Sequence, residues 1–271
     1  MILKEGGNVF KDKDANPLTT RIATPKVRPT VAAIEKIIGL EFVDDDMLGT
    51  TGKKVDPDGS FELNSSGDLD LNTDLNKISK DELIAKLTAW CKKQGIPDNE
   101  IMNVGRKFKG GWIHSAGDQV HFRMPIVGYD GYVQVDFMLT DDPDYQRGAK
   151  RGGTKNYSGA DRAVLLSSLA RGRGYKMSPK FGLVDPNNGD AVVTKDWNEI
   201  AKILLGDPNA KESDTHTVES MIAILRKDPN FKELIQPWLD TMEKEGKGLP
   251  NESLADKHLN RIKELTQRIV Q

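Results

Sequence analysis

The sequence predicts an α+β protein, in which a mixed sheet is flanked by helices and followed by a helical C-terminal region. Apolar and polar residues alternate in several stretches between residues 68 and 139, as they do along half-buried strands. Before and after these stretches, apolar residues recur at helical spacing between recognisable start and stop signals. The 271 residues, 37% of them hydrophobic, are enough for one large domain or two small ones without disulfides.

The N-terminal part predicts an arm and two amphipathic helices. Residues 1–26 show little periodicity and are expected to form an extended arm. Residues 29–39 form the first predicted helix. Residues 79–95 form the second, which starts at the capping pair Ser79 and Glu82. Its apolar face predicts four core residues: Leu83, Leu87, Trp90 and Cys91.

Strands dominate the middle of the chain and helices its end. The segment 68–71 alternates strictly, and the segments 120–124 and 132–139 flank a turn at residues 129–131, which predicts a β-hairpin. The later helices are expected at residues 160–170, 195–205 (capped by Thr194 and stopped by Gly206), 217–226, 229–244 and 253–270.

The composition excludes several classes of protein. Cys91 is the only cysteine, which excludes an intrachain disulfide and a cysteine zinc cluster, and fits a reducing, cytoplasmic setting. No apolar run approaches the roughly 20 residues of a membrane span, so no membrane partner is expected. Residues 1–10 have no apolar signal-peptide core. The four scattered histidines are interpreted as structural residues: His114, His121, His216 and His258.

The net charge of −2 hides a basic segment between residues 147 and 180. Asp161 is the only acidic residue within it, and several glycines interleave the positive charges. Such a segment is either a phosphate-binding surface or a solvated charged face. Its nine cations are Arg147, Lys150, Arg151, Lys155, Arg162, Arg171, Arg173, Lys176 and Lys180.

Three aspartates form the strongest candidate site. Asp68 and Asp70 lie two apart on a predicted strand, so their side chains share one face, where their charges repel unless a cation lies between them. Asp136 interrupts an otherwise apolar strand. If the two strands are neighbours, the carboxylates converge, and hard oxygen ligands suit Mg²⁺. The alternative is that Asp68 and Asp70 are exposed strand residues and Asp136 caps a turn.

A glycine-rich turn precedes the acidic pair, in the order Leu48-Gly49-Thr50-Thr51-Gly52. Backbone amides of such a turn can hold a phosphate, and a hydroxyl adds a further donor. The ordered set of Leu48-Gly49-Thr50, Asp68-Leu69-Asp70-Leu71 and Asp136 resembles the signature of the polymerase β-type nucleotidyltransferase superfamily. The run Asn156-Tyr157-Ser158-Gly159-Ala160, followed by Arg162, is similar to the segment that joins palm to thumb in family X DNA polymerases.

The resemblance implies a domain order and a chemistry. It implies an N-terminal arm and helix (1–46), a palm-like catalytic domain (47–150), a thumb-like subdomain (151–206) and a helical C-terminal region (207–271). Asp68, Asp70 and Asp136 would be catalytic and would bind two Mg²⁺ ions, for which Mn²⁺ can substitute. The implied nucleotide-binding residues are Gly49, Thr50, Thr51, Lys53, Tyr157, Ser158, Gly159 and Arg162.

The implied reaction moves a nucleoside monophosphate from a nucleoside triphosphate to a hydroxyl group. A nucleic-acid 3′ end is the favoured acceptor, as in a DNA polymerase or terminal transferase. Transfer to a tRNA, protein or small molecule is an alternative within the superfamily, and a non-catalytic nucleotide- or nucleic-acid-binding module is an alternative of a different class. The sequence gives no indication of oligomeric state.

Overall fold

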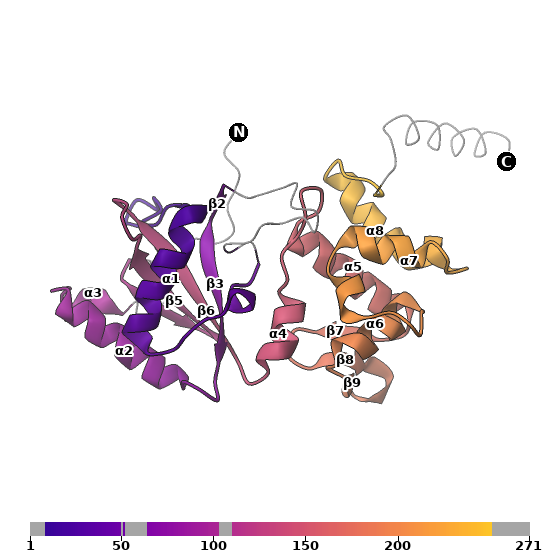
Figure 1. Ribbon diagram of the computed structural model, residues 1–271, viewed down its shortest axis with the longest axis horizontal. Helices are drawn as coiled ribbons and strands as arrows, with labels where there is room; N and C mark the ends of the chain where they lie inside the picture. The colour runs from indigo at the N-terminus through magenta and orange to yellow at the C-terminus, as the bar shows by residue number, and fades with distance from the viewer. Residues whose placement is uncertain (1–8, 50, 52–63, 103–109, 251–271) are drawn as a thin grey trace. The chain divides into compact units, whose positions relative to one another are not determined.

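The structure is a computed structural model, which describes residues 9–49, 51, 64–102 and 110–250. It divides the chain into two compact units, residues 1–159 and residues 160–271 (Figure 1). The finer division into the four segments that the resemblance implies stays a prediction.

The first unit contains a four-stranded mixed sheet in the order β3-β6-β5-β4. β3 and β6 are parallel neighbours, whereas β6 pairs with β5, and β5 with β4, in antiparallel fashion. The predicted strand at Asp68 and the predicted hairpin are therefore confirmed. The strands are β3 (Asp68–Asp74), β4 (Ile113–Ala116), β5 (Gln119–Pro125) and β6 (Tyr132–Thr140); a separate short pair joins β1 (Ile22–Ala23) to β2 (Ser65–Ser66).

Helices α1 (Thr24–Ile38) and α2 (Lys80–Lys93) pack against one face of this sheet (Figure 1). As the capping pair predicts, the Ser79 hydroxyl accepts a hydrogen bond from the Glu82 amide at 3.2 Å. Alternate apolar residues of the strands join the helices in one core, among them Leu69, Leu71, Val135 and Phe137. The predicted core residue Cys91 is fully buried there, and burial raises the pKa of its thiol to about 12.

Helix α1 begins five residues earlier than its predicted start at residue 29. Pro29 lies inside the helix, where its ring nitrogen cannot donate a backbone hydrogen bond. Val27 precedes this proline and is buried on the same face as Val31 and Ile34. Burial of this apolar face offsets the lost bond, so the end of the predicted arm is helical.

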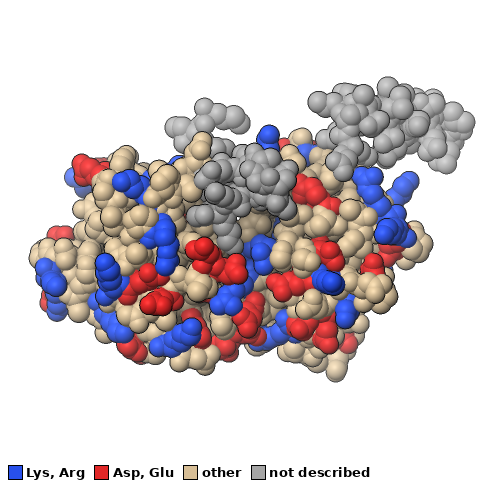
Figure 2. Space-filling view, viewed as in Figure 1, with Lys and Arg blue, Asp and Glu red and all other residues tan. Residues whose placement is uncertain are grey.

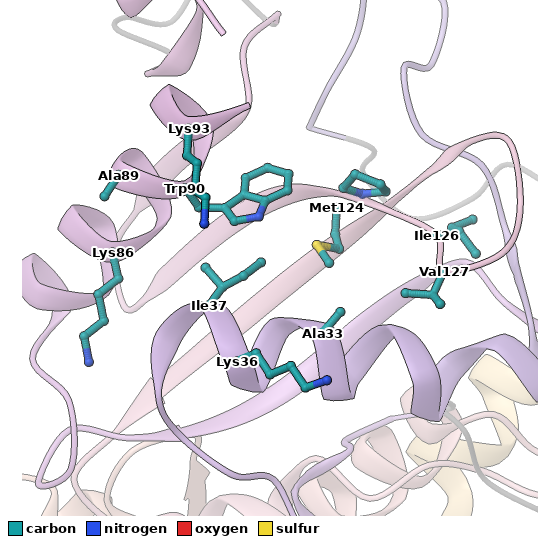
Figure 3. Close-up of a pocket in the computed structure, with 11 residues that line it drawn as sticks. Ala33, Lys36, Ile37, Lys86, Ala89, Trp90, Lys93, Met124, Ile126 and Val127 are labelled. Atoms are coloured by element: carbon teal, nitrogen blue, oxygen red, sulfur yellow. The ribbon is translucent and has the colours of Figure 1, made fainter. Parts of the chain in front are cut away.

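A groove of about 660 Å³ lies between α1 and α2, on the helical side of the sheet (Figure 3). Apolar side chains form most of its lining, among them Trp90 of α2 and Met124 of β5. Three lysines also line it: Lys36, Lys86 and Lys93. Asp68, Asp70 and Asp136 do not line this groove, because the residues that alternate with them along β3 and β6 are the ones packed in the core with the helices.

The second unit combines helices with a small antiparallel sheet in the order β7-β8-β9. Trp238 is fully buried in this unit, and its indole N–H donates to the carbonyl oxygen of Asp161 at 3.0 Å. The elements are α5 (Gly159–Gly172), β7 (Lys176–Ser178), β8 (Gly182–Asp185), β9 (Ala191–Thr194), α6 (Trp197–Leu205), α7 (Val218–Leu225) and α8 (Phe231–Lys244).

Four of the later predicted helices are confirmed as α5 to α8, whereas the small sheet was not predicted. The cap of α6 also differs from the prediction. Asp196, and not Thr194, accepts a hydrogen bond from the first-turn amide of Glu199, and the Thr194 hydroxyl accepts from the Asp196 amide. Gly206 ends α6 as predicted, in the left-handed conformation. The helix predicted at residues 253–270 lies outside the described residues.

Candidate metal centre

Three carboxylates meet on the sheet face opposite α1 and α2. Asp70 of β3 lies beside Asp136 of β6 in the parallel register, and Asp68 lies beside Gln134. One carboxylate oxygen from each of Asp68, Asp70 and Asp136 lies within 4.8 Å of the other two. The expected convergence of the three aspartates is therefore confirmed, and it follows from the two-residue repeat of β3 and the adjacency of β3 and β6.

The burial and the negative charges of the three aspartates favour binding of a cation between them. Asp136 is buried, and Asp68 and Asp70 are half-buried. Burial, followed by the negative charges of Asp68 and Asp136, raises the pKa of Asp70 to about 8, while the positive charge of Lys150 opposes this rise. A divalent cation between the carboxylates would remove the repulsion, and the all-oxygen donor set matches Mg²⁺ or Mn²⁺.

The glycine-rich turn is attached to β3 beside the three aspartates. Leu48 donates its N–H to the Asp70 carbonyl at 2.8 Å, and Gly49 donates to the Lys150 carbonyl at 2.9 Å. Thr51 is fully buried; its N–H donates to the Leu48 carbonyl at 3.0 Å, and its hydroxyl accepts from the Asp70 amide at 2.9 Å. These three amides already have protein partners, so the described part of the turn supports Asp70 rather than offering free N–H groups to a phosphate.

Gly49 is required by both backbone conformation and space. Its φ of +58° is in the left-handed region, which costs a residue with a side chain roughly 1–2 kcal/mol. A Cβ atom at this position would lie 2.9 Å from Oδ2 of Asp70. Gly49 therefore leaves room for a carboxylate of the candidate centre.

Replacing Gly49 with alanine is expected to weaken divalent-metal binding as well as stability, because the new methyl group must displace the Asp70 carboxylate. Gly95→Ala is the matched control, since Gly95 has a similar φ of +77° but no atom within 4 Å of its Cβ position. We expect both variants to lose roughly 1–2 kcal/mol of stability, and only Gly49→Ala to lose Mn²⁺ affinity in a titration. Equal Mn²⁺ affinity in the two variants would contradict this role of Gly49.

The segment after α4 (Pro143–Ala149) connects two predicted nucleotide-binding segments. Arg151 pairs with Gly49 in an isolated parallel bridge. The Cβ position of Gly159 lies 3.1 Å from the Arg151 carbonyl oxygen. Tyr157 is buried and Ser158 is exposed. The structure thus places both Gly49 and Gly159 beside the backbone of Arg151, while the nucleotide-binding role of their segments stays a prediction.

The other predicted nucleotide-binding residues have different surroundings. Thr50 and Lys53 lie outside the described residues. Arg162 belongs to the second unit, where it is 1% exposed. Its Nε donates to the carbonyl oxygen of Thr215 at 2.6 Å, and its guanidinium lies over the ring of Trp197 at 5.6 Å from the centroid. These contacts stabilise the interior of the second unit.

Several cations of the basic segment are engaged within the protein. Arg147 lies in helix α4. Figure 2 shows basic and acidic side chains interspersed over the visible face of the described residues. At least five of the nine cations bond to other residues through their side chains: Arg147 to Asp46 and Asp144, Arg162 to Thr215, Arg171 to Ser167, Arg173 to Asp228, and Lys176 to Asp190.

Two neighbours of Asp136 were missed by the sequence interpretation. His121, interpreted as a structural residue, places Nδ1 2.7 Å from Oδ1 of Asp136. The side-chain amide of Gln134 donates to Oδ2 of Asp136 at 3.1 Å. The hairpin turn contained the signal, because the register that follows from it pairs His121 with Asp136 on one face.

Comparisons of the chain with protein-family models, curated proteins and solved structures find no match. Among the described residues, every helix is too short or too polar to cross a membrane. The geometry of the three aspartates is therefore the basis on which a function can be argued.

Proposed function

We propose that this protein is a metal-dependent nucleotidyltransferase that moves a nucleoside monophosphate from a nucleoside triphosphate to a hydroxyl acceptor. The single observation that carries the proposal is the convergence of Asp68, Asp70 and Asp136 within 4.8 Å on two adjacent parallel strands. The order of the glycine turn and the three aspartates along the chain, which resembles the polymerase β-type superfamily, supports it.

In the proposed reaction, the acceptor oxygen attacks the α-phosphorus. A new P–O bond forms, the bond to the β-phosphate oxygen breaks, and pyrophosphate leaves. Mg²⁺, held by Asp68, Asp70 and Asp136, would neutralise charge on the attacking and leaving oxygens. Asp136 would orient the acceptor hydroxyl and take up its proton. The protein contributes mainly positioning, which can supply most of the rate in phosphoryl transfer.

Several classes of molecule could provide the acceptor hydroxyl group. A nucleic-acid 3′ end is favoured by the resemblance to the palm and thumb of family X polymerases. A protein or small-molecule acceptor is favoured by the net charge of −2 and by the five cations of the basic segment that already have partners, and a tRNA acceptor is a further alternative. A non-catalytic binding module is less consistent with a complete set of three carboxylates, since such a module does not need all three ligands.

The test is to incubate the protein with Mg²⁺ and each α-labelled ribonucleotide or deoxyribonucleotide. DNA, RNA and protein acceptors are offered in parallel, and Asp136→Ala is the control. We expect label to appear on one class of acceptor and to be lost in the variant. Label on no acceptor with either Mg²⁺ or Mn²⁺ would argue for the binding module, and equal labelling by Asp136→Ala would contradict the assigned site.

A further inference from the structure

Both carboxylate oxygens of Asp136 have a side-chain hydrogen-bond partner. Nδ1 of His121 lies 2.7 Å from Oδ1, and Nε2 of Gln134 lies 3.1 Å from Oδ2. The side chains of His121 and Asp136 are 8% and 12% exposed. An ionised carboxylate only accepts hydrogen bonds, so the imidazole donates its Nδ1–H. Two donors on opposite oxygens fix the rotation of the carboxylate about its bond to Cβ.

These two donors are themselves held in place. The His121 ring stacks on the His114 ring of β4, with centroids 5.6 Å apart and planes at 22°. The other amide atom of Gln134, Oε1, accepts a hydrogen bond from the Val9 amide at 2.9 Å. Because each donor has contacts on its far side, neither can turn away from Asp136 without losing another interaction.

We propose that His121 is a positioning residue of the metal centre, which orients Asp136 through the Nδ1–H hydrogen bond. This inference rests on the proposed function, because it assigns Asp136 the role of a metal ligand. With this bond in place, one oxygen of Asp136 lies within 4.8 Å of an oxygen of Asp68 and of Asp70, where a cation could be shared. Replacing a residue that orients a metal ligand through a hydrogen bond typically costs about 10- to 100-fold in metal affinity or activity.

The experiment compares His121→Asn with His121→Leu. Asparagine can place its amide nitrogen near the position of Nδ1, whereas leucine removes the donor. Mn²⁺ affinity is measured by the electron paramagnetic resonance signal of free Mn²⁺, which needs no turnover. We expect His121→Leu to bind Mn²⁺ about 10- to 100-fold more weakly, and His121→Asn to recover most of the affinity.

Two controls separate positioning from general effects. His216→Leu removes a histidine of the second unit and tests whether the loss of a histidine outside the candidate centre also lowers Mn²⁺ affinity. Gln134→Met removes the other donor of Asp136, and it tests the same idea if His121→Leu does not fold by circular dichroism. Its Mn²⁺ affinity should also fall. Unchanged affinity in His121→Leu, or an equal loss in His121→Asn, would overturn the proposal.

The same measurements distinguish this inference from the proposed function. If the wild-type protein binds Mn²⁺ and His121→Leu does not, but no nucleotide is transferred, the positioning role holds and the transferase activity fails. If the wild-type protein transfers nucleotides and both His121 variants show unchanged dependence on metal concentration, the transferase stands and the positioning role fails. A wild-type protein that binds no Mn²⁺ overturns both.

Discussion

Replacing Asp136 with asparagine is expected to lower the rate of nucleotide transfer at least about 10³-fold. A bound metal ion stabilises the transition state by several kcal/mol, and each ~1.4 kcal/mol of lost stabilisation slows the reaction about tenfold. Asparagine keeps the size of the side chain but offers only one acceptor oxygen. His121 and Gln134 both donate to position 136, so one of them would face the new NH₂ group.

This prediction is checked by single-turnover kinetics with saturating nucleotide, together with an Mn²⁺ titration. Asp141→Asn is the matched control, because Asp141 is an exposed aspartate directly after β6 and outside the three-carboxylate group. We expect Asp141→Asn to keep the wild-type rate and metal affinity. A rate loss of similar size in both variants would mean that net charge, and not the metal ligand, is responsible.

Replacing Asp70 with asparagine is expected to stabilise the metal-free protein by a few kcal/mol near pH 8, since each pKa unit corresponds to about 1.4 kcal/mol. The pKa of Asp70 rises from 3.8 to about 8 in the folded protein, chiefly through burial and the charges of Asp68 and Asp136. Between these two pH values the folded state binds more protons than the unfolded state. Stability of the wild type therefore falls as pH rises from about 4 to 8.

Denaturant unfolding without metal, measured at several pH values, checks this expectation. The Asp70→Asn variant should lack much of the decline with pH, and its advantage should disappear near pH 4. Asp118→Asn changes an exposed aspartate in the turn between β4 and β5, and we expect it to alter stability by less than about 0.5 kcal/mol. A less stable Asp70→Asn variant at pH 8 would mean that the Asp70 carboxylate is not destabilising without metal.

Saturating metal should reduce the stability advantage of Asp70→Asn over the wild type. Saturating Mg²⁺ stabilises only a folded state that binds it, by about 2.7 kcal/mol at one hundred times the dissociation constant. The wild type should gain this free energy, and Asp70→Asn should gain little of it. The candidate centre would then be an example of a site whose ligands cost stability until the cation is bound.

The acidic centre was predictable from the sequence because its parts follow local rules. The spacing of Asp68 and Asp70 puts both on one face of a strand, and an aspartate such as Asp136 in an apolar strand indicates a buried charge that needs a partner. The adjacency of β3 and β6 could not be derived in this way, because a parallel pairing depends on the whole sheet and leaves no signal in either strand.

The residues that surround the three aspartates were less predictable, because their contacts also depend on how strands and turns pack together. His121 looks like a core histidine in its own strand, and only its cross-strand pairing shows that it contacts Asp136. The sequence predicted Gly49 as a residue whose backbone amide binds phosphate. Only the structure shows that its φ is positive and that a side chain at this position would collide with Asp70. The β7-β8-β9 sheet was missed because its strands are three or four residues long, too short for a clear alternation.

The buried thiol of Cys91 makes the first unit observable by chemical labelling. With a pKa near 12 and no exposed surface, this thiol has almost no reactive thiolate while α2 remains packed on the sheet. A thiol reagent can therefore modify the chain only in molecules whose first unit has opened. Because Cys91 is the only cysteine, the labelling rate reports openings of the first unit alone, without a contribution from the second unit.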